Sequence, residues 1–477
     1  MKVLLAVLPC ERGQHGVQTD AVLARCASIA SKAAYALPPL GLMYIGALLR
    51  AQGGFAVSLV DCAASRTGEK KFIRRLAVEA PDSLVCATGA STLAHDTTVL
   101  ENVKAALPSI RIIAVGAHVT LQHEEVLTQS CVDYVVRGEP ELTVAELAHA
   151  LATGESCRAI EGLSYKEGGG VMVNPDRPLP ENIDALPFPA RDLVAGYRYS
   201  IPFAMTDNFT IMITSRGCPY PCIFCATQVY NGTRCRVRSA ANVIAELEEI
   251  VHKFGIRDIG FWDDTFTLGR AHVLDICNRI IEKKLGVNWI CLSRVDTVDA
   301  ELLQLMRKAG CYQIQYGVES GDQGVLDALK KGITIDQVKK AFAATRRCGI
   351  ETAAFFMLGC PGETVETMER TIKLSKELHA DYASFNIVTP YPGTELYKAQ
   401  KPNITETWNT FDAFHVSTNA GLQAEVIEKY LRKAYLNFYF NPRYLLRRLR
   451  SISSFKKLMR QLQTGVQLFS RWVPREG

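Results

Sequence analysis

Residues 215–225 read SRGCPYPCIFC and place Cys218, Cys222 and Cys225 in a CxxxCxxC spacing. The motif follows the apolar run at residues 209–213, a predicted strand, so the cysteines occupy the loop that leaves this strand. Three thiolates this close can bind three irons of a cubane [4Fe–4S] cluster, whereas such a cluster takes four ligands. The remaining iron is left for a ligand that is not protein. An open iron can chelate the amino and carboxylate groups of S-adenosylmethionine (SAM) and pass an electron to its sulfonium.

Zinc and disulfide bonds account for the cysteines less well. A structural zinc site usually shows two CxxC pairs or a CxxC with a distant histidine pair, and no such second pair is visible. Disulfide frameworks are typical of short secreted chains, whereas this chain has 477 residues and 15 cysteines. The cysteines outside the motif, such as Cys86, Cys277 and Cys291, lie singly in apolar runs and are predicted to be buried and inert.

The composition is that of a soluble globular protein. Hydrophobic residues make up 48% and charged residues 22% of the sequence. The length suggests two or three domains of about 150 residues each. The first residues form an apolar run too short for a signal peptide, and no uninterrupted apolar stretch reaches the roughly 18 residues of a membrane-spanning helix. Unpaired thiols then indicate the reducing cytoplasm.

Residues 1–155 alternate short apolar strands with helical patterns, which predicts a doubly wound parallel sheet covered on both faces. Ligands of such sheets bind beyond the carboxyl ends of the strands. Small and hydroxyl-bearing residues gather at three of these ends, and the candidate ligand-binding residues are Thr88, Ser91, Thr92, Gly116, His118 and Glu139. Any α/β domain needs glycines at its turns, so the spacing alone leaves a purely structural role open.

Residues 156–206 are predicted to form a hairpin, with its turn at residues 168–170, and a proline-rich linker. Residues 207–395 then present six strand candidates separated by helical segments. Six such units predict a partial (β/α)6 barrel, in which the chemistry lies at the carboxyl ends of the strands. The cysteine loop occupies the first of these ends.

Residues 207–395 resemble the core of radical SAM enzymes. Beyond CxxxCxxC, the resemblance rests on motifs at the ends of the later strands: FWDDTFT at 261–267, SRVD at 293–296, YGVESG at 316–321, FMLGCPGET at 356–364 and TPYPGT at 389–394. The resemblance implies that Cys218, Cys222 and Cys225 ligate the cluster. It further implies roles in SAM binding for Phe224 at the adenine, for Asp263, Asp264 and Thr265 at the amino end, and for Ser293, Arg294 and Glu319 at the carboxylate and ribose. A buried ion pair between Arg294 and Glu319 is the structural alternative.

The N-terminal part resembles the cobalamin-binding domain that precedes this core in one large subfamily, on the strength of LPPLGL at residues 37–42 and GAHVT at 116–120. Many such domains carry Asp-x-His-x-x-Gly, whose histidine is the lower cobalt ligand, but residues 9–16 read PCERGQHG. The resemblance therefore implies cobalamin bound without a histidine lower ligand. His118 could pack beside the corrin or be a hydrogen-bonded loop residue, and a form of the domain that has lost cobalamin stays open.

Residues 396–477 form a predicted helical region outside the resemblance. Residues 443–475 hold nine Lys or Arg and no Asp or Glu, and their apolar residues recur every three or four positions. A basic amphipathic helix can lie on an anionic membrane surface, and the alternative is a helix packed on the barrel with its charges in water. Nucleic-acid binding is not expected, because no added RNA-binding domain is visible.

These features together predict a cytoplasmic enzyme that reductively cleaves SAM to a 5′-deoxyadenosyl radical. The family resemblance implies cobalamin-dependent methyl transfer to an unactivated carbon of a small-molecule, lipid or tetrapyrrole substrate, with an electron donor such as flavodoxin or ferredoxin. A radical cyclase, oxidative enzyme or rearrangement enzyme is the alternative within enzymes, and an iron–sulfur sensor or binding protein is the alternative outside them.

Overall fold

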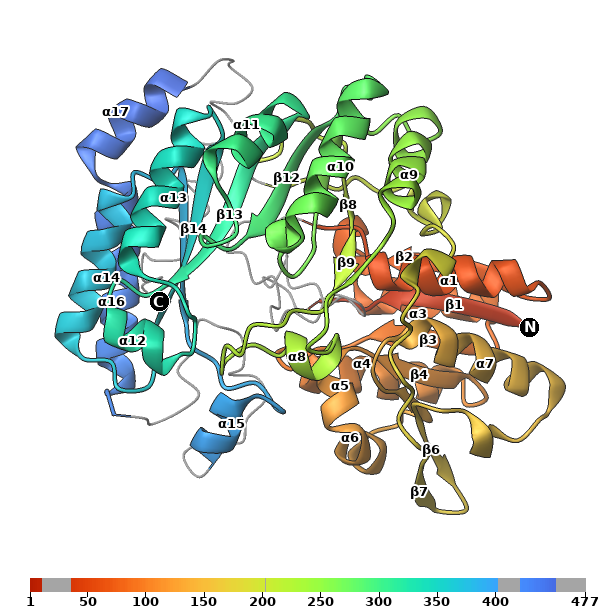
Figure 1. Ribbon diagram of the computed structural model, residues 1–477. Helices are drawn as coiled ribbons and strands as arrows, with labels where there is room; N and C mark the ends of the chain where they lie inside the picture. Colours follow the sequence, from red (N-terminus) through yellow and green to blue (C-terminus); the bar gives the residue numbers. More distant parts are fainter. Residues whose placement is uncertain (11–35, 202, 402–420, 452–477) are drawn as a thin grey trace.

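The computed structural model describes residues 1–10, 36–201, 203–401 and 421–451. Two mainly parallel sheets organise these residues, and they lie next to each other with their helices packed around them (Figure 1). The N-terminal sheet and the partial barrel predicted from the sequence are both confirmed. The boundaries between the domains stay a prediction.

The N-terminal sheet has seven strands in the order β2-β1-β3-β4-β5-β6-β7. Its parallel strands are β1 (Lys2–Val7), β2 (Ala56–Asp61), β3 (Ser83–Ala87), β4 (Arg111–Val115) and β5 (Tyr134–Val136). The predicted hairpin, β6 (Leu163–Glu167) and β7 (Gly170–Val173), extends this sheet by antiparallel pairing with β5. The strand order reverses between β1 and β3, and such a switch point is where doubly wound sheets open a crevice for ligands.

Helices cover both faces of this sheet. One face carries α1 (Leu40–Gln52) and α7 (Pro140–Thr153), and the other carries α3 (Glu69–Glu79) and α4 (Leu93–Ala106). Short helices α2 (Cys62–Ser65), α5 (Ala117–Leu121) and α6 (His123–Gln129) follow the strand ends. Because both faces are buried, the strands are apolar along almost their whole length.

The second sheet is fully parallel, in the order β15-β14-β13-β12-β11-β8. Its strands are β8 (Phe209–Met212), β11 (Asp258–Phe261), β12 (Asn288–Ser293), β13 (Cys311–Glu319), β14 (Glu351–Leu358) and β15 (Tyr382–Ile387). The helices between them are α9 (Ala240–His252), α10 (Arg270–Glu282), α11 (Ala300–Lys308), α12 (Gln323–Ala328), α13 (Ile335–Arg347) and α14 (Val365–Glu377). The first and last strands do not pair with each other, so the barrel stays open.

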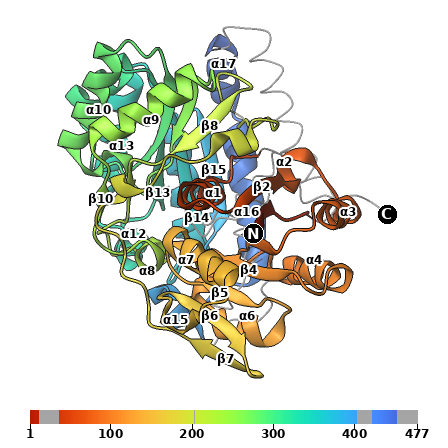
Figure 2. The ribbon, with the colours of Figure 1, turned by 90° about the vertical axis from the view of Figure 1, so that its right-hand side faces the viewer.

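The two sheets share one apolar core. Residues of β1 and α1 pack in the same buried cluster as Phe209 and Ile211 of β8 and Trp262 after β11, and α1 lies at this junction (Figure 2). The loops at the carboxyl ends also meet, because a Cβ on Gly393, beyond β15, would contact both Leu121 of α5 and Val229 of α8 (Thr227–Tyr230). The loops at the carboxyl ends of both sheets therefore lie next to each other.

A C-terminal helix closes the exposed edge of β15. Two tyrosines one turn apart on α16 (Ala424–Tyr439) reach its backbone: Tyr435 Oη donates to the Phe385 carbonyl at 3.0 Å and Tyr439 Oη to the Ala383 carbonyl at 2.8 Å. The same hydroxyls accept from the Phe385 and Ala383 amides at 3.2 and 3.1 Å. Unpaired strand edges promote aggregation, and here side chains satisfy groups that a further strand would otherwise bind.

The last described helix, α17 (Pro442–Ser451), turns an arginine toward the barrel. Arg448 is buried, and its guanidinium donates to Asp381 at 3.1 Å and to the Tyr382 hydroxyl at 2.8 Å. Packing on the barrel, one of the two expectations for the basic segment, is thus observed for α17, although the Arg448 charge is buried and not in water. Membrane contact of the outer face of α17 stays a prediction, and residues 452–477 lie outside the described residues. Within the described ranges, no helix combines the length and hydropathy needed to cross a bilayer.

The tyrosine contacts predict a stability effect. Replacing Tyr435 and Tyr439 together by Phe should lower the free energy of unfolding by about 2–5 kcal/mol, because each buried backbone group left unsatisfied costs about 1–3 kcal/mol. Urea denaturation measures the change. Tyr430→Phe on the same helix is the control. Its half-buried hydroxyl interacts with the Glu369 side chain and not with the edge of β15, so the change should stay near the roughly 1 kcal/mol of a single hydrogen bond.

Candidate active site

The cysteine loop leaves β8 at the carboxyl end of the barrel. A two-residue strand, β9 (Ser215–Arg216), pairs with β10 (Arg236–Val237) and brings the start of the loop against residues 231–234. Gly217 adopts φ +92°, and a Cβ there would lie 2.4 Å from the Arg234 carbonyl oxygen, so only glycine fits. The three cysteines that follow are half-buried. The loop thus holds its thiols at the carboxyl end of the barrel without burying them fully.

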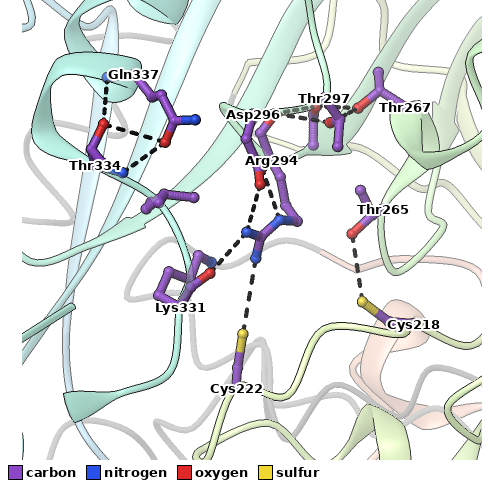
Figure 3. A network of polar contacts seen from close by, with 12 residues as sticks. Cys218, Cys222, Thr265, Thr267, Arg294, Asp296, Thr297, Lys331, Thr334 and Gln337 are labelled. Atoms are coloured by element: carbon purple, nitrogen blue, oxygen red, sulfur yellow. Dashed lines mark hydrogen bonds and ion pairs between the residues drawn. The ribbon is translucent and has the colours of Figure 1, made fainter. Parts of the chain in front are cut away.

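Two buried cations lie beside Cys222. The Arg294 guanidinium approaches its sulfur at 4.0 Å (Figure 3). It also stacks on the Tyr220 ring, at 3.5 Å from the centroid. Burial raises the pKa of the Cys222 thiol, while the charges of Lys331 and Arg294 oppose this rise. Burial also raises the pKa of Cys225, to about 11. Cations here favour a thiolate, which is the form that binds iron.

Arg294 and Glu319 have separate partners. Arg294 makes a two-pronged pair with Asp296, at 2.9 Å for both contacts, and also donates to the Lys331 carbonyl at 2.8 Å. Glu319 accepts from Lys331 Nζ at 2.6 Å, and both side chains are buried. The structural alternative of an ion pair between Arg294 and Glu319 was therefore wrong. Glu319 sits at φ +69°, an unusual value for a residue with a side chain.

The Asp-Asp-Thr run after β11 braces the cysteine loop. Asp263 is fully buried and accepts from the Thr214 amide at 2.9 Å and from the Ser215 hydroxyl at 2.6 Å. Asp264 accepts from the Gly217 amide at 3.1 Å, and also from Thr227 and Asn231 at 3.0 and 3.1 Å. Thr265 Oγ1 lies 4.0 Å from the Cys218 sulfur. Of the three, Thr265 is the residue next to a cysteine.

The remaining barrel candidates lie around the same loop. Ser293, at the end of β12, shares a hydrogen bond of 2.5 Å with Thr267. Phe224 faces the buried cation Lys331, whose Nζ is 5.9 Å from the ring centroid. The structure thus brings Phe224, Thr265, Arg294 and Glu319 toward the cysteines, directly or through Lys331, whereas Asp263 and Asp264 hold the backbone. Their assignment to SAM binding stays a prediction.

The donor set suits a cluster. Among the described residues, no three or more His, Cys, Asp or Glu side chains converge as ligands of one metal ion would. A cubane makes a different demand, because each of three irons takes one thiolate and the sulfurs are spread around the cluster. Three half-buried thiols on one loop, with Arg294 and Lys331 beside the second, fit an anionic cluster.

The N-terminal candidates gather at the ends of β3 and β4. Gly116 adopts φ +129°, and a Cβ there would lie 2.7 Å from the Thr88 carbonyl oxygen. The Thr88 hydroxyl is buried and has no hydrogen-bond partner among the described residues. Burial lowers the pKa of His118 to about 4, so its imidazole is neutral near pH 7. An unsatisfied buried hydroxyl at this close contact of two strand-end loops fits a polar group of a bound ligand.

Ser91, Thr92 and Glu139 have other surroundings. Ser91 is half-buried, and Thr92 closes a turn with the backbone of Gly89. Glu139 is buried and pairs with two arginines of the barrel domain, Arg216 and Arg236. Its carboxylate thus joins the two domains, and binding of cobalamin by Glu139 stays a prediction. Residues 11–16, which cover the missing histidine motif, lie outside the described residues.

Comparison with known proteins agrees with this geometry. The model of the B12 binding domain matches residues 27–148, and that of the Radical SAM superfamily matches residues 212–375. An uncharacterized methyltransferase of Pyrococcus horikoshii is 36% identical over 415 residues, which cover 86% of this chain and 89% of the relative. The chain belongs to the radical SAM superfamily. It carries the B12-binding domain of that superfamily's cobalamin-dependent members, as expected from the motifs.

This radical SAM protein is also similar to a curated cyclase in sequence and to a solved methyltransferase in structure. The anaerobic magnesium-protoporphyrin IX monomethyl ester cyclase of Rubrivivax gelatinosus is 29% identical over 76% of this chain and 66% of the relative. The structure of the radical SAM methyltransferase TsrM from Kitasatospora setae, with cobalamin and a [4Fe–4S] cluster bound, aligns with a TM-score of 0.67. That alignment covers 83% of this chain and 76% of TsrM at 19% identity, so it shows a shared fold.

Several residues of this radical SAM site escaped the sequence analysis. Lys331, Tyr220 and Asp296 complete the surroundings of Arg294 and Glu319, and Arg216 ties the motif to the other domain. No sequence pattern pointed to Lys331, because it lies in the loop after α12, outside the motifs. Arg216 and Tyr220 stand inside the quoted motif, so their place in the chain could have drawn attention to them.

The Asp264 contacts predict a loss of cluster binding. Asp264→Ala removes three hydrogen bonds, one from Gly217 in the cysteine loop and two from Thr227 and Asn231 just after it, each worth about 1.5–3 kcal/mol when the acceptor is charged. We expect the variant to hold clearly less iron than the wild type after anaerobic reconstitution, measured by iron analysis and visible absorbance. Asp299→Ala, which removes the helix cap of α11, is the control with unchanged iron. Equal iron contents in both variants would contradict the bracing role.

Proposed function

We propose that this radical SAM enzyme is a cobalamin-dependent C-methyltransferase that acts on an unactivated carbon of a small-molecule, lipid or tetrapyrrole substrate. The observation that carries the proposal is that the carboxyl ends of the N-terminal sheet and of the barrel lie next to each other. The cysteine loop at the end of β8 and the loops after β3 and β4 belong to sheets that share one core and touch through Gly393, Leu121 and Val229. Cofactors bound at both ends would lie around one cavity.

In this proposal Cys218, Cys222 and Cys225 ligate the cluster. When bound, the cluster with SAM supplies a substrate radical and the corrin supplies a methyl group. Arg294 and Lys331 place positive charge beside the cluster, and Lys331 also holds the Glu319 carboxylate in place. Phe224 offers an aromatic face on the same side. Because the three cysteines are only half-buried, SAM can reach the loop.

The N-terminal loops would hold the corrin. Gly116 lets the loop after β4 pack directly on the Thr88 backbone, where a Cβ would clash, and the Thr88 hydroxyl beside it can bind a polar group of the corrin. His118 is neutral and buried at the start of α5, so it suits packing against an apolar face. Reductive cleavage of SAM consumes an electron, and we propose an external donor such as flavodoxin or ferredoxin.

One alternative has an observation in its favour. The similarity to a protein named as an anaerobic cyclase keeps a radical cyclization or oxidation open as the reaction of this site. Mass separates the two reactions, since methyl transfer adds a CH₂ to the substrate and cyclization does not. A cluster-bearing sensor would cleave no SAM at all.

The test combines SAM cleavage with label transfer. The reconstituted enzyme, with hydroxocobalamin and a strong reductant, should form 5′-deoxyadenosine from methyl-deuterated SAM and transfer a CD₃ group to a component of a cell extract. Cys222→Ala should abolish both outcomes, and Cys348→Ala, at the half-buried end of α13, should preserve them. Deoxyadenosine without CD₃ transfer would favour the cyclase, and no deoxyadenosine would favour the sensor.

We propose further that α17 rests on an anionic membrane surface. Its arginine Arg448 is turned toward the barrel, whereas Leu445, Leu446 and Leu449 are 45%, 57% and 60% exposed. An amphipathic helix that buries a charge and exposes leucines has an apolar face left to cover. The excess of cations in residues 443–475 complements anionic lipid headgroups rather than a neutral partner.

Vesicle binding tests this surface. The protein should sediment with phosphatidylglycerol-containing vesicles more than with pure phosphatidylcholine, and less at high salt. Leu445→Ser with Leu449→Ser should weaken binding at least about tenfold, because burying each leucine contributes about 1.5–3 kcal/mol. Val78→Ser, at an exposed apolar residue of α3, is the control. A wild type that ignores anionic vesicles, or that dimerises through the leucines instead, would contradict the proposal.

A further inference from the structure

An arginine inside the cysteine motif reaches into the other domain. Arg216 stands two residues before Cys218, and its Nη1 donates to Glu139 at 2.8 Å while its Nη2 donates to Glu141 at 2.6 Å. The three side chains are only 2%, 3% and 3% exposed. The guanidinium also lies over the Tyr44 ring of α1, at 5.4 Å from the centroid. A fully buried fork thus joins the start of the cysteine loop to the N-terminal domain.

A second arginine completes the junction. Arg236 of β10 is the register partner of Arg216 in the β9–β10 pair, and it too donates to Glu139, at 3.2 Å through Nη1. Glu139 and Glu141 belong to the first turn of α7 and its cap, where the helix dipole favours negative charge. Two arginines of the barrel domain therefore meet two carboxylates of the N-terminal domain, and the charges balance.

Hydrogen bonds continue from this junction to the loop after β4. The Gly138 amide, next to Glu139, donates to Thr120 Oγ1 at 3.1 Å, and Thr120 Oγ1 donates to the Gly116 carbonyl at 2.8 Å. On the other side, the Gly217 amide, next to Arg216, donates to Asp264 at 3.1 Å. Hydrogen bonds and ion pairs, joined by the peptide links 138–139 and 216–217, thus connect the proposed corrin loop with the proposed cluster loop.

We infer that Arg216 is a positioning residue that couples the two loops, so that a corrin bound at the loops after β3 and β4 orders the cysteine loop. The inference rests on the proposed function, because it takes these loops as the corrin site. Arg216 itself touches neither cofactor in this assignment. It acts through the backbone of Gly217, the residue between it and the first cysteine.

The choice of groups argues for positioning rather than for stability alone. Buried ion pairs lose much of their gain to desolvation, and apolar residues of the same size often stabilise a protein as well or better. A guanidinium held by two carboxylates instead fixes distance and direction, since its donors lie in one plane. Such a contact is strong in only a narrow range of positions. A movement of α7 would therefore also move β9 and the cysteine loop that follows it.

Hydrogen–deuterium exchange of the whole chain without its cluster tests the coupling. Addition of hydroxocobalamin to the wild type should slow exchange in peptides that cover residues 88–92 and 116–120, and also in the peptide that covers 215–225. Glu141→Gln weakens the Arg216 fork but leaves Glu139 paired with both arginines. In this variant the response at residues 88–120 should persist, and the response at residues 215–225 should fall at least about twofold.

Two further variants sharpen the result. Arg216→Lys keeps the charge but loses the planar fork, and should lose the response at 215–225 in the same way. Glu181→Gln is the matched control, because Glu181 pairs at 3.1 Å with Arg234, beside the same loop, but both side chains are about four-fifths exposed. Thermal melting of each variant shows whether it is folded; should Glu141→Gln unfold, Arg216→Lys decides.

The outcomes separate the inference from the proposed function. A full response at 215–225 in folded Glu141→Gln and Arg216→Lys overturns the coupling, and so does a wild type that binds hydroxocobalamin without that response. A wild type that binds no hydroxocobalamin overturns the cobalamin part of the proposed function instead. Loss of the response in both variants, with Glu181→Gln unchanged, supports Arg216 as the positioning residue.

Discussion

Buried charges cannot be left unpaired, and this constraint sets how the two sheets of the molecule meet. Arg216 and Arg236 form ion pairs with Glu139 and Glu141 across the domain junction. A second group repeats the arrangement: Glu246 of α9 is fully buried and pairs with Arg191 of the linker at 2.7 Å and with Arg238 at 2.5 Å. Removing one member of such a group leaves the other charges buried without a partner, which is costly. The groups therefore fix the positions of the two domains, the linker and the cysteine loop relative to one another.

The site depends on that arrangement because neither sheet provides it alone. The barrel supplies the cysteine loop, the brace of Asp263 and Asp264, and the cations beside Cys222. The N-terminal sheet supplies the glycine-lined loops with the Thr88 hydroxyl. Apolar packing of α1 against β8 brings the sheets together, but it has little direction. The ion pairs add the direction, since a guanidinium accepts few geometries.

The open barrel needs its edge protected, and the protein uses side chains for this purpose. Tyr435 and Tyr439 are spaced by one helical turn, which matches alternate residues of β15 closely enough for both hydroxyls to bind its backbone. The consequence extends to α17, which follows α16 directly and is held by Arg448 against Asp381 and Tyr382. Closing the edge in this way leaves the leucines of α17 on the outside.

The sequence by itself determined the architecture and the chemistry. Strand and helix periods predicted both sheets, and the spacing of Cys218, Cys222 and Cys225 predicted a cluster loop at the end of β8, because these signals are local in the chain. Only the tertiary structure decided that Arg294 pairs with Asp296 and Glu319 with Lys331, and that Glu139 binds Arg216. Glu139 and Arg216 are 77 residues apart, and even Arg294, two residues from Asp296, could have paired elsewhere. Folding decides which charged groups come within hydrogen-bonding distance and with what geometry, and a linear pattern does not record that distance.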